Sequence, residues 1–312
     1  MRRDAPSESD IRDQLWARKN WGRWGEGDQL GTVNLITQEK RIEAAQLVRD
    51  GVTISLSMPF PTSHSEVNPR PAQHLMLQRE SRRGGGHASD YYGIAYHGLT
   101  STHIDALCHV WDRDGIYGGR DPDQVLTAGR AQACDIDQWR NGLATRAVVF
   151  DVPGFRGVDF VEYDQPVHGW ELEQIAESKS FEVRAGDALV VYCGRDRWPA
   201  ELGEWGRRGH DRPAYESPRA GVHASVLEFI RDTDASMLVW DMQDAYPTGC
   251  VDIAWTVHGA IWAYGLAVVD NASLGPLVEY CRTHDRSDFF LVTAPLRVEG
   301  GTGSPVNPIA IL

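Results

Sequence analysis

Histidines and an aspartate gather in one short segment of this sequence. Three of the eleven histidines fall between His97 and His109, with His103 and Asp105 between these ends. Residues i and i+2 of an extended segment point to the same face, so His103 and Asp105 would present an imidazole and a carboxylate side by side. This pair suits Zn²⁺, Mn²⁺ or Fe²⁺, and the absence of a nearby cysteine pair argues against a structural zinc site. His109 could sit beside the pair without binding metal, as a general acid or base.

His97 is harder to place from spacing alone. Six residues of extended chain separate it from His103 and span about 20 Å. Both histidines can therefore bind one ion only if the chain between them turns back, which Gly98 and Ser101 permit. A structural alternative stays open, because buried histidines commonly hydrogen-bond to carboxylates without any metal. Cys108, in the same segment, is more typical of a small buried apolar residue than of a nucleophile.

The segment also resembles a known signature. Thr102-His103-Ile104-Asp105 and His109 match the pattern His-x-Gly-Thr-His-x-Asp-x-x-x-His at the same spacing. This pattern is the signature of the cyclase superfamily of metal-dependent hydrolases, which includes bacterial kynurenine formamidase, isatin hydrolase and a dienelactone hydrolase. The similarity continues at residues 24–34, 112–119, 240–242 and 301–305. It therefore covers nearly the whole chain.

The resemblance implies a role for each matching residue. His103 and Asp105 correspond to metal ligands, and Asp105 to the carboxylate that can bridge two ions. His109 corresponds to the histidine that transfers protons. His258 and Asp270, twelve residues apart, are similar to the distal His and Glu ligands of the family. The implied cofactor is a divalent metal ion, Zn²⁺ or Mn²⁺, with one or two ions per chain.

The chain departs from the family pattern at two positions. Leu99 occupies the place of the first motif histidine, four residues before His103, and Asp270 is shorter than the family glutamate. His97 can replace the missing ligand through a longer turn. If it does not, the ligand set is poorer and a single ion is favoured over a pair.

Taken with the resemblance, these residues predict an enzyme. The expected reaction is hydrolysis of an amide or lactone bond in a small, cyclic or aromatic substrate, by water activated at the metal and with His109 as general acid/base. A polyketide-type cyclase or dehydratase, which would use the ion as a Lewis acid, is the first alternative. A metal-free protein that binds small molecules is the second.

Composition excludes several other classes of partner. Among 312 residues, 44 Asp and Glu against 31 Lys and Arg leave a formal net charge of −13, which argues against binding to nucleic acids or to anionic membranes. The longest apolar run, residues 260–269, is shorter than the roughly 20 residues that span a bilayer. An apolar signal segment is not evident at the N-terminus, and the five cysteines never form a C-x-x-C pair. We therefore expect a cytoplasmic protein with reduced thiols.

Alternating segment types predict the architecture that must hold these residues. Helices are expected at 37–49, 170–178, 223–231, 255–264 and 274–281, and strands at 52–58, 147–151, 188–193, 237–241, 266–269, 289–292, 296–298 and 308–312. This alternation is typical of an α/β fold. Residues 59–90 show no periodicity and are expected to form a long loop around the pocket.

The domain division follows from the same pattern. Residues 1–31 predict an N-terminal arm that lies over the body through Trp16, Trp21 and Trp24, and residues 32–312 a single catalytic domain. The resemblance implies a swivelling β/β/α fold, in which helices surround a barrel-like mixed sheet. It also implies a homodimer or homotetramer, with the arm as a candidate for contact with a neighbouring subunit.

Overall fold

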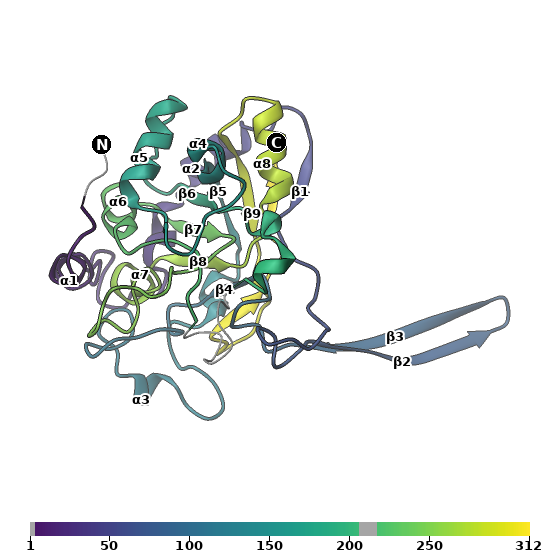
Figure 1. The fold of residues 1–312 in the computed structure, drawn as a ribbon. Coiled ribbons are helices and arrows are strands. Elements are labelled where there is room, and N and C mark those ends of the chain that lie inside the picture. Colours follow the sequence, from purple (N-terminus) through teal and green to yellow (C-terminus); the bar gives the residue numbers. More distant parts are fainter. Residues whose placement is uncertain (1–3, 206–216) are drawn as a thin grey trace.

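A mixed nine-stranded sheet forms the centre of the computed structural model, which describes residues 4–205 and 217–312. The sheet curls into a half-barrel with helices packed around it (Figure 1), and its strand order is β1-β11-β9-β5-β6-β7-β8-β4-β10. The strands are β1 (Thr53–Ser55), β4 (His103–Asp105), β5 (Leu143–Asp151), β6 (Ala188–Tyr192), β7 (Met237–Trp240), β8 (Ala267–Asp270), β9 (Asp288–Thr293), β10 (Gly303–Pro305) and β11 (Ile309–Ile311). The expected α/β architecture, with helices around a barrel-like mixed sheet, is confirmed.

Four neighbouring strands of this sheet run in parallel, from β5 through β6 and β7 to β8. Every residue of β6 and β7 is buried, as expected for parallel strands that are covered on both faces. The loops that follow β6, β7 and β8 start at Cys193, Asp241 and Asn271. Because the carboxyl ends of parallel strands share one edge of a sheet, these loops gather at the same edge.

The helices pack around this sheet. They are α1 (Glu8–Ala17), α2 (Gln38–Ala45), α3 (Pro122–Val125), α4 (Val152–Arg156), α5 (Gly169–Ser178), α6 (Val226–Asp232), α7 (Gly259–Tyr264) and α8 (Gly275–Thr283). Thr37, a residue type preferred at helix N-caps, caps α2 by accepting a hydrogen bond from the Lys40 amide. The helix expected from residue 255 starts only at Gly259, because Thr256 and Val257 instead donate hydrogen bonds to the Asp244 carboxylate. Among the described helices, none combines the length and the apolar character that a bilayer crossing requires.

The N-terminal segment contains a helix and lies against the body. Ser7 and Asp10 form a capping box at the start of α1, which packs against α6 and α7. The indole rings of Trp16 and Trp21 meet the ring of Trp262 edge-on, with ring centroids 5.0 and 6.1 Å apart. The division of the chain at residue 31 stays a prediction, and so does the oligomeric state.

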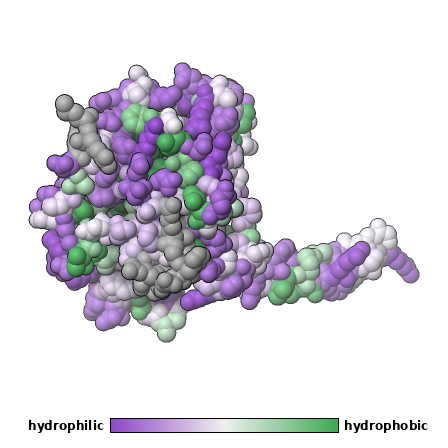
Figure 2. Space-filling model, in the orientation of Figure 1, coloured by the Kyte–Doolittle hydropathy of each residue, from purple (hydrophilic) through white to green (hydrophobic). Residues whose placement is uncertain are grey.

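The predicted loop is present at residues 59–72, but for residues 73–90 the prediction is wrong. Strands β2 (Gln73–Arg82) and β3 (Gly85–Gly93) form an antiparallel hairpin that projects from the body (Figure 1). Alternation did not reveal it, because period-two patterning arises when one face of a strand is buried, and β3 is largely exposed. A register shift between Met76 and Gln78 breaks the pattern further. Figure 2 shows apolar side chains on this hairpin, where the exposed large hydrophobic residues are Leu75, Met76, Leu77, Tyr91 and Tyr92.

The strand expected at residues 296–298 is also absent, since these residues are irregular. The last part of the chain instead contributes β10, which pairs with β4 so that Gly303 lies opposite Asp105 and Pro305 opposite His103. His103 and Asp105, the two predicted ligands on β4, therefore sit between β8 and β10 in the sheet.

Candidate metal centre

Two neighbouring strands bring three of the predicted ligands together. His103 and Asp105 lie on β4, and the β4–β8 register places Asp270 directly opposite His103, so that these side chains share one face of the sheet. The His103 Nε2 atom is 3.4 Å from Asp105 Oδ1 and 3.7 Å from Asp270 Oδ2. His258, at the start of α7, points its Nε2 atom at the same carboxylates, 3.2 Å from Asp270 and 3.9 Å from Asp105.

His97 reaches the same point because the chain does turn back. Its Nδ1 atom lies 3.0 Å from Asp105 Oδ1, and its Nε2 atom lies 3.1 Å from the Thr302 hydroxyl. Gly303 provides the space for this ring. A Cβ atom at position 303 would lie 3.1 Å from His97 Cε1 and 2.5 Å from the Ile104 carbonyl oxygen, so a larger residue would push against the imidazole or the strand.

The other two imidazoles are oriented from outside the cluster. His103 Nδ1 donates to the Ser101 carbonyl oxygen at 2.8 Å, and His258 Nδ1 forms a short hydrogen bond with Asp244. When either ring is neutral, its proton lies on Nδ1, and the Nε2 atom, which faces Asp105, is free to bind a metal. This arrangement, with one ring nitrogen donating outward and the other available inward, is typical of histidines that bind metals.

Asp105 stands at the centre of the cluster and is fully buried. Among the described residues, neither of its carboxylate oxygens accepts a hydrogen bond of good geometry, and His97 Nδ1 is likewise left without one. Burial alone would raise the pKa of Asp105, but the imidazoles of His109 and His103 hold this pKa below its usual range. An ionised, buried carboxylate without hydrogen bonds is costly unless a cation compensates it, so the donor set fits a bound divalent ion.

The ligand atoms form two triads that share this carboxylate. One consists of His97, His103 and Asp105, the other of Asp105, His258 and Asp270, and within each the ligand atoms lie within 4.8 Å of one another. Mixed imidazole and carboxylate sets suit Zn²⁺ and Mn²⁺. The arrangement offers room for one ion or for two with Asp105 between them.

Asp270 is held in place despite being shorter than the family glutamate. Trp240 Nε1 donates to its Oδ1 atom, and Gln243 Nε2 donates to its Oδ2 atom. Burial disfavours the charged form of His258, but the carboxylates of Asp270 and Asp244 raise the pKa of this ring well above its ordinary value. The pocket therefore attracts positive charge.

His109 belongs to neither triad. Its ring stacks on the His97 ring, with centroids 3.7 Å apart and planes 5° apart, and its Nε2 atom lies 3.8 Å from Asp105 Oδ1. About a quarter of the His109 side chain is exposed, so a small molecule in the site can reach it. Burial lowers the pKa of His109 to about 4, which leaves the ring neutral and able to accept a proton at neutral pH.

Two residues of this site were missed or undervalued in the sequence. Asp244 follows a strand, and an acidic residue at that position suggests a turn residue rather than a partner of a metal ligand. Its neighbour Asp241 does have such a structural role, because its carboxylate accepts hydrogen bonds from the three backbone amides of residues 193–195. Thr302 lies in a glycine-rich segment that carries no signal of its own beyond the resemblance. Cys108 is buried, and burial raises the pKa of its thiol to about 12, in agreement with a packing role.

An apolar groove runs beside the strand that carries the site. Its volume is about 770 Å³, and its lining includes Ser101, Phe60, Tyr92, Leu296 and Pro305. Its lining includes none of the residues of the histidine cluster, but because Pro305 lies opposite His103 in the sheet, the groove borders β4.

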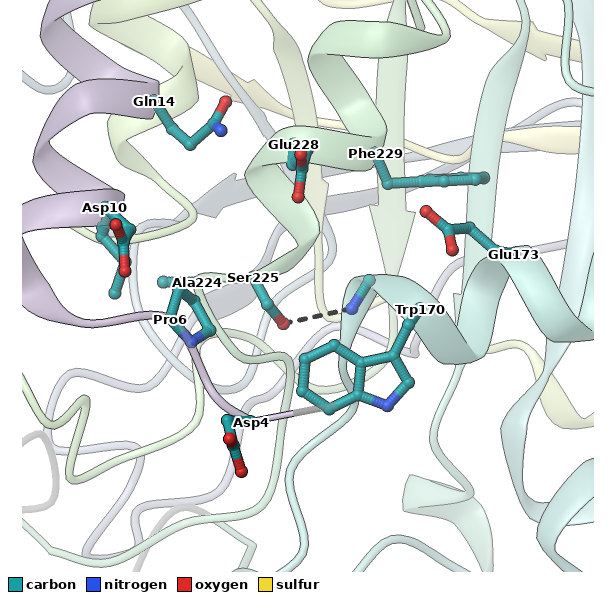
Figure 3. Close-up of a pocket in the computed structure, with 12 residues that line it drawn as sticks. Asp4, Pro6, Asp10, Gln14, Trp170, Glu173, Ala224, Ser225, Glu228 and Phe229 are labelled. Carbon is teal, nitrogen blue, oxygen red and sulfur yellow. Dashed lines mark hydrogen bonds between the residues drawn. The ribbon is translucent and has the colours of Figure 1, made fainter. Parts of the chain in front are cut away.

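Figure 3 shows a separate, smaller pocket between α1, α5 and α6, of about 290 Å³. Acidic side chains from the three helices surround it, among them Asp10, Glu173 and Glu228, next to the Trp170 ring. Ser225 Oγ accepts a hydrogen bond from the Gly169 amide at its floor. The pocket shares no lining residue with the histidine cluster.

Comparisons with known proteins agree with this geometry. A family model described as "Putative cyclase" matches residues 53–245, more than half of the chain. A solved structure described as a novel cyclase is 25% identical, with a TM-score of 0.81 over 94% of this chain and 99% of the other. Isatin hydrolase A from Labrenzia aggregata is 16% identical, with a TM-score of 0.59 over 86% of this chain and 94% of the other.

Isatin hydrolase A from Ralstonia solanacearum is also 16% identical, with a TM-score of 0.56 over 86% of this chain and 93% of the other. A search of curated protein sequences gave no match. The family match, the shared fold and the Thr-His-x-Asp-x-x-x-His segment lead to one conclusion: the chain belongs to the cyclase family.

Proposed function

We propose that the protein is a metal-dependent hydrolase that opens an amide or lactone bond in a small, cyclic or aromatic substrate. The observation that carries this proposal is the buried Asp105 carboxylate, which lacks good hydrogen bonds and faces the nitrogens of four imidazoles. The family membership and the isatin hydrolases of the same fold support it. The ligands would be His97, His103, Asp105, His258 and Asp270.

A divalent ion bound there would polarise the substrate carbonyl and lower the pKa of water to about 7. The protein's own part is positioning and proton transfer. Thr302, Ser101 and Asp244 fix the ring orientations of the three ligand histidines. His109, neutral and partly exposed, takes a proton from the attacking water and delivers it to the leaving nitrogen or oxygen.

The groove beside β4 supports the substrate class. Phe60, Tyr92 and Leu296 contribute apolar and aromatic surface, which favours a planar or hydrophobic substrate over a highly charged one.

The test begins with elemental analysis of the purified protein, which gives the metal and its stoichiometry. The metal-loaded protein is then incubated with cyclic amides, aryl formamides and lactones, and product masses are recorded. Hydrolysis adds the mass of one water, whereas a dehydratase removes it and a cyclase leaves the mass unchanged. Absence of metal together with retained ligand binding would instead indicate a binding protein.

A further inference from the structure

The chain turns back between His97 and His103, and no residue within this turn is a candidate metal ligand. Leu99 stands where the family has its first histidine, and its side chain packs against the hydrophobic core. Gly98, at φ +133°, adopts a backbone conformation that other residues rarely take. Contacts with other parts of the chain must stabilise this turn, because glycine permits the conformation but does not favour it.

Asn271 supplies the first part of the answer. It is fully buried, and its Nδ2 atom donates to the carbonyl oxygens of Gly98 at 2.8 Å and Ser101 at 3.0 Å. The Ser101 carbonyl oxygen is also the acceptor for His103 Nδ1. One amide group therefore binds both ends of the turn. Its backbone φ of +53° suits asparagine, which tolerates the left-handed region.

Two further side chains complete the contacts. Arg195 Nη2 donates to the Leu99 carbonyl oxygen at 2.6 Å, and its Nη1 donates to Asn271 Oδ1 at 2.7 Å. Gln243 Nε2 donates to the Gly98 carbonyl oxygen at 3.0 Å. These donors follow β6, β7 and β8, whose carboxyl ends meet at one edge of the sheet.

We propose that Arg195, Gln243 and Asn271 form a carbonyl clamp, a set of positioning residues that closes the turn and so delivers His97 to Asp105 as a metal ligand. The proposal rests on the proposed function, because it assigns His97 to that metal site. It explains the departure from the family pattern at Leu99. The ligand is His97, two residues before this position, and Leu99 instead holds the turn through its core packing and its carbonyl oxygen.

The energetic argument is that of buried polar groups. The Asn271 side chain and the Ser101 carbonyl oxygen are buried, and a buried polar group that loses its partner is costly. An open turn would separate the buried Asn271 amide from the Ser101 carbonyl oxygen, whereas the carbonyl of the exposed Gly98 could bind water instead. The buried pair therefore favours the closed turn before any metal arrives. His97 is then preorganised, and less ordering entropy opposes metal binding.

A double-mutant cycle tests this coupling. Asn271→Gly removes the donor while keeping a residue that suits the observed φ. Zn²⁺ affinity is measured by competition with a chromophoric chelator for wild type, Asn271→Gly, His97→Ala and the double variant. We expect Asn271→Gly to weaken Zn²⁺ binding by about 10–100-fold, and the double variant to bind within about threefold of His97→Ala, because the clamp acts through His97.

Asn20→Gly is the matched control, since Asn20 is a buried asparagine whose Nδ2 donates to the Tyr264 carbonyl oxygen outside the clamp; it should bind Zn²⁺ as wild type does. The visible absorption of Co²⁺ in Asn271→Gly should match that of His97→Ala. If Asn271→Gly does not fold, Arg195→Lys, which keeps the charge but loses the planar fork, replaces it in the same cycle.

The possible results separate the two proposals. Wild-type affinity in Asn271→Gly, or an equal loss with and without His97, overturns the clamp while the metal site stands. A wild-type protein that binds no Zn²⁺, or binds it as well after His103→Ala, overturns the proposed function itself.

Discussion

Exchanging Asp244 for asparagine should weaken metal binding without removing any ligand. Asp244 Oδ1 accepts hydrogen bonds from the Thr256 hydroxyl and the Val257 amide, and Oδ2 bonds to His258 Nδ1. In Asp244→Asn the oxygen stays with the Val257 amide, so the new NH₂ group faces His258. Two donors then meet, and the imidazole must move its proton to Nε2, the atom that faces Asp105.

The size of the effect follows from this change of tautomer. A ligand nitrogen that carries a proton cannot bind a metal, and the substitution also removes a negative charge near the ion. Loss of an outer partner of this kind typically costs 10–100-fold in metal affinity, or about 1.4–2.7 kcal/mol. We expect Asp244→Asn to fall in this range, and His258→Ala to lose at least as much.

The assay is Zn²⁺ titration in competition with a chelator, combined with thermal unfolding of the metal-free protein. Asp187→Asn is the control: Asp187 is another fully buried carboxylate, bonded to Arg146 at 2.7 Å and to the Arg184 amide at 2.8 Å. It should lower the melting temperature and leave Zn²⁺ affinity unchanged. Unaltered affinity in Asp244→Asn, alongside a clear loss in His258→Ala, would refute the tautomer argument.

Three other outcomes are expected. His109→Ala should keep wild-type metal content while turnover falls by about 10²–10⁴-fold, as measured by steady-state kinetics and elemental analysis; unchanged turnover would remove His109 from the mechanism. Gly303→Ala places a Cβ atom against the Ile104 carbonyl oxygen and the His97 ring. It should lower the free energy of unfolding by about 1–3 kcal/mol and weaken Zn²⁺ binding. Wild-type values for both quantities would contradict the described packing. Adding Zn²⁺ at about 100 times its Kd should stabilise the metal-free protein by about 2.7 kcal/mol, which is measured as a higher melting temperature. Asp105→Asn should lose most of this stabilisation. Stabilisation of equal size in that variant would place the metal elsewhere.

Local patterning was sufficient for part of this molecule. The period-two geometry of an extended segment placed His103 and Asp105 on one face, and β4 has that geometry. The buried strands β6, β7 and β8 were likewise visible as apolar runs. In both cases the information lies within a few consecutive residues, because side-chain direction in a strand depends only on the backbone of that strand.

Contacts between distant segments decided the rest. The hairpin at residues 73–93 buries too little surface to show alternation, and the role of Asp244 depends on a histidine fourteen residues away that approaches it in space. His97 reaches Asp105 through a turn whose carbonyls accept hydrogen bonds from the ends of three separate strands. The sequence by itself determined which residues could bind a metal, and it showed that His103, Asp105 and His109 match the family signature. Only the tertiary structure decided that His97 joins them, because the donors that close its turn lie about 100 to 170 residues further along the chain.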